Sequence, residues 1–210
     1  MKDIQTVLFD LDGTLIDTNE LIKKSFRYTF EQYQLSFTDE EISKFNGPPL
    51  RETFKKYNPD QVDEMIETYR EHNLLHHKDY VQLFPHVIET LEQLKGKQIK
   101  LGIVTSKMKD SALVGIELTG LTPFFETIVT WDDVVHAKPH PEPVLKALHA
   151  LKGNAKSALM IGDNYHDIVS GQRAGVKTAG VAWSRKGEDF LKSYKPTYML
   201  QDMRDVLTII

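Results

Sequence analysis

The sequence predicts an α/β fold, a Rossmann-like doubly wound parallel sheet that is interrupted after its first strand by a helical insertion. Residues 7–9 form a short apolar run that ends in Asp10, as a buried strand does when it stops at a polar loop. Residues 16–80 carry apolar side chains at helical spacing and no convincing strand. Beyond Pro85, apolar runs alternate with amphipathic stretches. This alternation is typical of a parallel sheet, because each crossover between parallel strands needs a connecting helix.

The elements can be placed in chain order from these two periodicities. The predicted strands are residues 7–9, 99–104, 127–129, 158–161, 178–181 and 198–200. The predicted helices of the alternating region cover residues 87–94, 111–118, 141–151 and 166–174. In the insertion, Val62, Met65, Ile66 and Tyr69 have the spacing of one buried helix face. We therefore expect an α/β core domain of residues 1–15 and 81–210, and a helical domain of residues 16–80.

Composition excludes several classes of partner. The chain has 210 residues, which suffice for one core with a smaller module. Its net charge of −4 argues against nucleic acid, because binding to phosphate backbones needs a basic surface. No run approaches the roughly 20 apolar residues of a membrane span. The absence of cysteine excludes disulfides and fits a reducing compartment, so we expect a cytoplasmic protein that binds neither membrane nor nucleic acid.

Polar residues follow the predicted strands at the places where ligands bind to open parallel sheets, beyond the carboxyl ends. Asp10 follows the first strand, Thr105 the second and Asp163 a later one. A carboxylate such as Asp10 can act as a covalent nucleophile on a phosphoryl group, and Asp12 can then protonate the leaving group and activate water. Lys138 and Thr105 would stabilise the charge that develops. Oxygen ligands such as these carboxylates suit magnesium, Mg2+.

Four motifs carry a resemblance to a known family. Asp10-Leu11-Asp12-Gly13-Thr14, Thr105 at a strand end, Lys138-Pro139, and Gly162-Asp163 with Asp167 resemble, in this chain order, the haloacid dehalogenase-like superfamily. The resemblance implies that the helical insertion is a small cap over the active site. It also implies roles for individual residues: Asp10 as nucleophile, Asp12 as acid and base, Thr105 and Lys138 as phosphate binders, and Asp10, Asp12 and Asp163 as Mg2+ ligands supported by Asp167.

Longer stretches, including residues 47–50, 69–73 and 178–183, resemble the small-cap pyrophosphatases of that superfamily. The resemblance implies a small-molecule substrate, inorganic pyrophosphate. His140 stands where such proteins commonly have Asp, and His86 where they often have Gly, so these departures bear on substrate preference. The alternative to a pyrophosphatase is a phosphoglycolate phosphatase, which has similar core motifs. The sequence does not indicate the oligomeric state.

Two other activities of the same superfamily fit less well. A dehalogenase has no need of a leaving-group acid at Asp12. Phosphosugar mutases carry His and Arg at the positions that Ile22 and Leu50 occupy here. The residues therefore favour a phosphohydrolase.

The remaining candidates are less specific. Ser106 is a candidate substrate-binding residue beside Thr105, although both hydroxyls could cap the following helix. Arg51 is a candidate contact from the helical insertion to a substrate phosphate. His72 and His76 have a zinc-binding spacing but no apparent third ligand. His136 and His140 share that spacing, but Pro139 interrupts the helix that would align them, so we expect no metal there.

Overall fold

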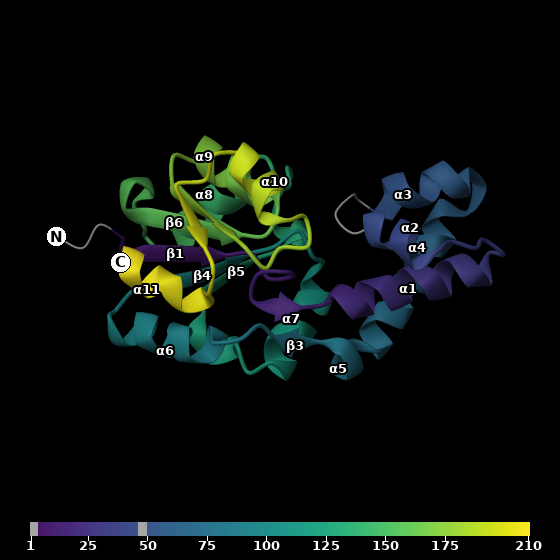
Figure 1. Cartoon of the computed structure of the whole chain (residues 1–210), viewed down its shortest axis with the longest axis horizontal. Helices are drawn as coiled ribbons and strands as arrows, with labels where there is room; N and C mark the ends of the chain where they lie inside the picture. Colours follow the sequence, from purple (N-terminus) through teal and green to yellow (C-terminus); the bar gives the residue numbers. More distant parts are fainter. Residues whose placement is uncertain (1–3, 46–49) are drawn as a thin grey trace. The chain divides into compact units, whose positions relative to one another are not determined.

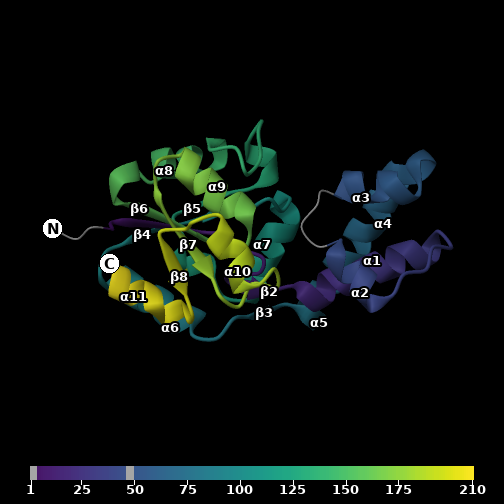
Figure 2. The same cartoon turned by 45° about the horizontal axis from the view of Figure 1, so that its top comes forward.

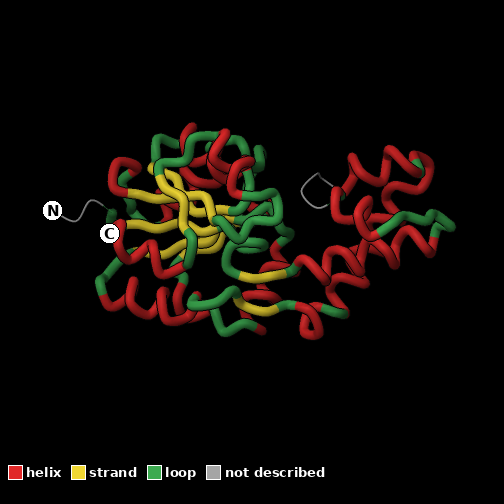
Figure 3. Tube along the Cα trace, viewed as in Figure 1, coloured by secondary structure: helices red, strands yellow, loops and turns green. Residues whose placement is uncertain are grey.

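The computed structural model describes residues 4–45 and 50–210. In this part of the chain six parallel strands form one sheet in the order β5-β4-β1-β6-β7-β8. Figure 3 shows the strands of this sheet in yellow. Numbered along the chain within the sheet, that order is 3-2-1-4-5-6, the doubly wound arrangement, so the predicted fold class is confirmed. The strands are β1 (Thr6–Phe9), β4 (Lys100–Val104), β5 (Thr127–Val129), β6 (Ala158–Gly162), β7 (Lys177–Val181) and β8 (Tyr198–Leu200).

Helices lie on both faces of the sheet, as parallel crossovers require. In both views α8 and α9 cover one face, and α6 and α11 lie on the other (Figures 1 and 2). The helices of this α/β part are α6 (Val87–Gly96), α7 (Lys109–Leu118), α8 (Glu142–Ala150), α9 (Tyr165–Arg173), α10 (Glu188–Ser193) and α11 (Val206–Ile209). Short 3-10 turns occupy Thr122–Phe124, Trp131–Asp133, Ala155–Ser157 and Met203–Asp205.

The core between the sheet and α8 explains why these strands form. All four residues of β1 are buried, and the strand pairs with a neighbour on each side. Leu8 and Met160 pack in one cluster with Val144 and Leu148 of α8. Burying a side chain of this size stabilises the fold by about 1.5–3 kcal/mol.

Strand register brings the predicted site residues to one edge of the sheet. Phe9 is level with Ile103 of β4 and with Ile161 of β6. Asp10 is therefore level with the end of β4, and Thr105 and Asp163 follow one residue further along. This edge includes the point between β1 and β6 where the strand order reverses, which is where open α/β sheets bind ligands.

A two-stranded antiparallel pair marks the place where the chain leaves the α/β part and returns to it. β2 (Ile16–Asp17) pairs with β3 (Gln82–Leu83), and Ile16 is opposite Leu83. The expectation of a strand-free segment from residue 16 is wrong at this point. Ile16 is fully buried and its partner is 67 positions later, so no local periodicity could show the pairing.

The chain divides into two compact units, Met1–Asp17 with Gln82–Ile210, and Thr18–Val81. The second unit contains α1 (Asn19–Gln32), α2 (Asp39–Lys44), α3 (Leu50–Tyr57), α4 (Val62–Leu75) and α5 (His77–Tyr80), with a 3-10 turn at Pro59–Gln61. Its core is aromatic, with Phe26 packed against Phe30, Phe54 and Tyr69. Of residues 47–50, which resemble the small-cap pyrophosphatases, residues 47–49 lie outside the described part of the chain. In residues 4–45 and 50–210, none of the helices is long and apolar enough to cross a membrane.

Candidate active site

The loop after β1 places two carboxylates at the carboxyl edge of the sheet. The backbone N–H of Asp10 donates to the carbonyl of Ile161 at 2.8 Å, which continues the pairing between β1 and β6. Gly13 then turns the chain with a φ of +82°, a conformation that favours glycine. A Cβ atom at this position would also lie 2.4 Å from the Oδ2 atom of Asp163. The glycine of the Asp-x-Asp-Gly motif is therefore needed both for the turn and for the approach of the third carboxylate.

Lys138 lies between two of the carboxylates. Its Nζ atom donates to Asp10 Oδ1 at 2.7 Å, to Asp167 Oδ1 at 2.5 Å and to the carbonyl of Val104 at 2.8 Å. Only 3% of the lysine side chain is exposed. A buried ammonium with three oxygen partners has all its donors satisfied, so this lysine has one fixed position.

Asp167 is the third residue of α9 and takes part in the cap of this helix. Its Oδ2 atom accepts a hydrogen bond from the backbone N–H of Asn164 at 3.0 Å, as part of the capping box of α9. Its Oδ1 atom is the one that Lys138 contacts. One oxygen of Asp167 thus caps α9 while the other orients the lysine.

The carboxylates of this cluster destabilise one another's charged forms. Burial, opposed by Lys138 and reinforced by Asp167, raises the pKa of Asp10 from 3.8 to about 7. Burial and the negative charges of Asp10 and Asp167 raise the pKa of Asp163 well above 3.8. Although burial alone would lower the pKa of Lys138, Asp10 and Asp167 raise it above its ordinary value. Two buried carboxylates and a partly buried one therefore lie near one ammonium, which favours the binding of a further cation.

The second strand end contributes a hydroxyl and another lysine. Thr105 is buried, and its Oγ1 atom accepts a hydrogen bond from the backbone N–H of Lys107 at 3.1 Å. The Nζ atom of Lys107 donates to Asp12 Oδ1 at 2.9 Å. Ser106 is exposed. Because α7 begins only at Lys109 and its cap residue is Met108, neither hydroxyl caps this helix.

Arg51 is found in the other unit, on α3. Its guanidinium group pairs with the carboxylate of Asp63 on α4, and both side chains are exposed. The substrate contact expected of Arg51 stays a prediction, as does that of Ser106.

Two contacts at the site have no counterpart in the sequence analysis. The first is the ion pair of Lys107 with Asp12, which joins residues 95 positions apart. The hydroxyl of Ser184 donates to the carbonyl of Asp163 at 2.6 Å and so fixes the backbone of that residue. Ser184 lies 21 positions from Asp163 and in no motif, so the sequence carried no signal for this contact.

Comparison with known proteins agrees with this geometry. The model of a family described as haloacid dehalogenase-like hydrolase matches residues 7–181. The chain belongs to this family of hydrolases. The motif resemblance is thereby confirmed, and the four motifs all lie within the matched range.

Relatives that match the chain over almost its full length show a more specific similarity than the family model does. A pyrophosphatase PpaX from Oceanobacillus iheyensis is 56% identical over 207 residues, which cover 99% of this chain and 97% of that protein. A pyrophosphatase PpaX from Bacillus pumilus is 53% identical and covers 99% of this chain and 96% of its own. The solved structure of a haloacid dehalogenase-like hydrolase from Streptococcus pneumoniae is 29% identical, with a TM-score of 0.88 over 99% of each chain. These similarities confirm the closer resemblance to small-cap pyrophosphatases.

Haloacid dehalogenase-like hydrolases typically use a divalent metal ion, and the carboxylates of this chain fit one. Ligand oxygens of Asp10, Asp163 and Asp167 all lie within 4.8 Å of one another. An all-oxygen donor set of this kind suits a hard cation. The excess of buried negative charge supports the same conclusion, because a cation would offset it.

Proposed function

We propose that this hydrolase cleaves inorganic pyrophosphate into two phosphates, with Asp10 as covalent nucleophile and Mg2+ as cofactor. The observation that carries the proposal is the position of Asp10. Its buried carboxylate lies at the end of β1, bonded to Lys138, with a second carboxylate two residues later that Lys107 contacts. The names of relatives that match almost the whole chain support pyrophosphate as the substrate.

In the first step a carboxylate oxygen of Asp10 attacks a phosphorus atom of pyrophosphate. The bond from that phosphorus to the bridging oxygen breaks, and phosphate leaves with the proton that Asp12 donates. The product on the enzyme is an aspartyl-phosphate at Asp10. Lys138 orients the attacking carboxylate, and Thr105 is positioned to donate its hydroxyl hydrogen to a phosphoryl oxygen.

In the second step Asp12 accepts a proton from a water molecule that attacks the same phosphorus atom. The bond between phosphorus and the Asp10 oxygen breaks, which releases phosphate and restores the carboxylate. Lys107 keeps the Asp12 side chain in place for both proton transfers. A magnesium ion, held by Asp10, Asp163 and the backbone carbonyl of Asp12 with support from Asp167, would offset the negative charge of the phosphoryl group.

The helical unit, Thr18–Val81, acts as the cap domain of this enzyme. A cap that closes over the site excludes water and restricts the enzyme to small substrates. Arg51 on α3 is the residue we propose for contact with the second phosphate of the substrate, through charge-assisted hydrogen bonds. We place the enzyme in the cytoplasm, because a chain without cysteine fits a reducing compartment.

The experiment is a comparison of kcat/KM for pyrophosphate, 2-phosphoglycolate, β-glucose 1-phosphate and p-nitrophenyl phosphate in the presence of Mg2+, by release of phosphate or nitrophenol. We expect pyrophosphate to be preferred. A kcat/KM for phosphoglycolate about tenfold above that for pyrophosphate, or about 1.4 kcal/mol, would show that pyrophosphate is not the preferred substrate. The proposed phosphatase mechanism would still stand. Solved structures named for phosphoglycolate phosphatases are 24% and 21% identical to this chain, so they show its fold alone.

A further inference from the structure

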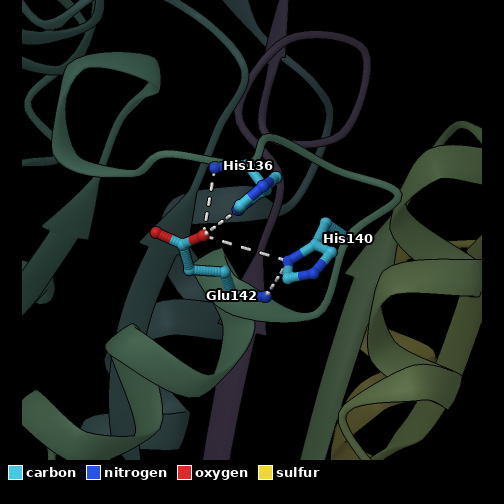
Figure 4. Close-up of side chains that lie close together, drawn as sticks. All are labelled: His136, His140 and Glu142. Carbon is cyan, nitrogen blue, oxygen red and sulfur yellow. Dashed lines mark hydrogen bonds and ion pairs between the residues drawn. The ribbon is translucent and has the colours of Figure 1, made fainter.

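Three side chains that can ligate a metal lie together where the loop after the Trp131–Asp133 turn enters α8 (Figure 4). They are His136, His140 and Glu142, and one ligand atom of each lies within 4.8 Å of the others. The Oε2 atom of Glu142 is 3.0 Å from Nδ1 of His136 and 3.9 Å from Nδ1 of His140. The centroids of the two imidazole rings are 4.6 Å apart. Residues 136–140 form no helix, as expected from Pro139, but the loop brings the two histidines together without one.

The spacing of these atoms fits a small tetrahedral ion. Bonds from zinc to nitrogen or carboxylate oxygen are about 2.0–2.1 Å long, so neighbouring ligand atoms of a tetrahedron lie about 3.3 Å apart. The two measured separations, 3.0 and 3.9 Å, lie on either side of that value. The side chains of His136 and His140 are 63% and 48% exposed, so small rotations of their rings can close the difference and leave a fourth position open to water.

Glu142 is already oriented for this role. Its Oε1 atom accepts a hydrogen bond from the backbone N–H of Val135 at 2.8 Å, and its Oε2 atom accepts one from the backbone N–H of His136 at 3.0 Å. These backbone hydrogen bonds, with the Val135 bond contributing most, hold the pKa of Glu142 below its ordinary value. Outer partners of this kind fix the direction of a ligating carboxylate.

We propose that His136, His140 and Glu142 form a second metal site, specific for Zn2+ and separate from the three-carboxylate site. Two imidazole nitrogens and one carboxylate oxygen suit zinc, whereas magnesium requires hard oxygen ligands. The site spans the segment that carries Lys138, because its histidines stand two residues before and two residues after that lysine. A bound ion therefore joins the two ends of the segment that brings the ammonium to Asp10.

The test is a zinc titration of the metal-stripped full chain in excess Mg2+, with a chromophoric chelator as competitor. The variants are His136→Ala and His140→Ala, and the matched control is His149→Ala, which removes an exposed histidine from α8 outside the cluster. His140→Gln serves as a second variant that keeps a polar side chain. Thermal unfolding without metal checks that each variant folds as the wild type does.

We expect each cluster variant to bind Zn2+ at least about tenfold more weakly than the wild type, and His149→Ala to bind it equally well. Zn2+ should raise the unfolding temperature of the wild type and of His149→Ala, but not that of His140→Ala or His140→Gln. Equal affinity in wild type and both His140 variants would overturn the proposal. The absence of zinc uptake by the wild type in excess Mg2+ would show that the three residues only brace the loop, and would overturn it as well.

Discussion

Lys138→Met tests whether the buried lysine holds the carboxylate cluster together. Methionine keeps an unbranched side chain of similar length and removes the charge. The substitution deletes the hydrogen bonds to Asp10, Asp167 and Val104 and leaves the two carboxylates close together without their ammonium. Removal of one partner from a buried ion pair costs about 3–5 kcal/mol of unfolding free energy, because the other charge stays buried.

The cost should grow with pH. Lys138 stays protonated across the neutral range in both the folded and the unfolded chain, so its own titration adds no pH dependence there. Asp10 has a raised folded pKa, about 7 against 3.8, so its contribution to stability is present below pH 3.8 and is lost as the pH rises through about 7. Without the lysine, the pKa of Asp10 rises further and the loss becomes larger. We expect a loss near 3 kcal/mol at about pH 8 and a clearly smaller one at about pH 5.5.

The assay is urea unfolding of metal-free protein at both pH values, with the exposed Lys156→Met as control. Surface substitutions of this kind change stability by about 0.5 kcal/mol or less. In the same variant, kcat/KM with Mg2+ should fall by about 10²–10³, the scale seen when one charge-stabilising donor is removed. An equal loss of stability at the two pH values, or a loss no larger than that of Lys156→Met, would show that Lys138 does not hold the carboxylate cluster together.

Two further predictions concern Lys107, which contacts Asp12, and Asp163, one of the candidate metal ligands. Lys107→Ala should lower kcat for pyrophosphate by about 10², and Lys107→Arg should restore part of the rate. The free energy of unfolding should change by about 1 kcal/mol or less in Lys107→Ala, because the ion pair with Asp12 is partly exposed. Unchanged kcat in Lys107→Ala would show that Lys107 does not position Asp12. Asp163→Asn should weaken Mg2+ binding in calorimetry yet make the metal-free protein more stable at about pH 8, since it removes a carboxylate whose pKa is raised by burial and by the negative charges of Asp10 and Asp167. Tight Mg2+ binding, or lower metal-free stability, would contradict this.

The sequence predicted the sheet because each strand is a short run of apolar residues between turn signals, and buried parallel strands need no other information. It could not show β2 and β3, whose two-residue pairing depends on the return of the chain after the whole helical unit. It also omitted α10, a six-residue helix in which only Leu191 is buried, so its apolar pattern is too short to detect.

At the site, the sequence placed Asp10, Thr105 and Asp163 near one another because strand ends in a parallel sheet meet at one edge. The partners of these residues depend on side-chain directions in loops, which spacing does not encode. Lys107 therefore emerged as a neighbour of Asp12 only in the structure. The same limit explains His136 and His140, for which helix geometry was the wrong guide because their segment is a loop.

Asp10→Asn tests whether Asp10 forms the covalent intermediate. The measurement is kcat for pyrophosphate with saturating Mg2+, on protein whose circular dichroism matches the wild type, beside Asp189→Asn as an exposed control on α10. We expect a loss of at least about four orders of magnitude for Asp10→Asn and none for Asp189→Asn. A folded Asp10→Asn enzyme that turns over pyrophosphate within about tenfold of the wild-type rate would contradict this role of Asp10.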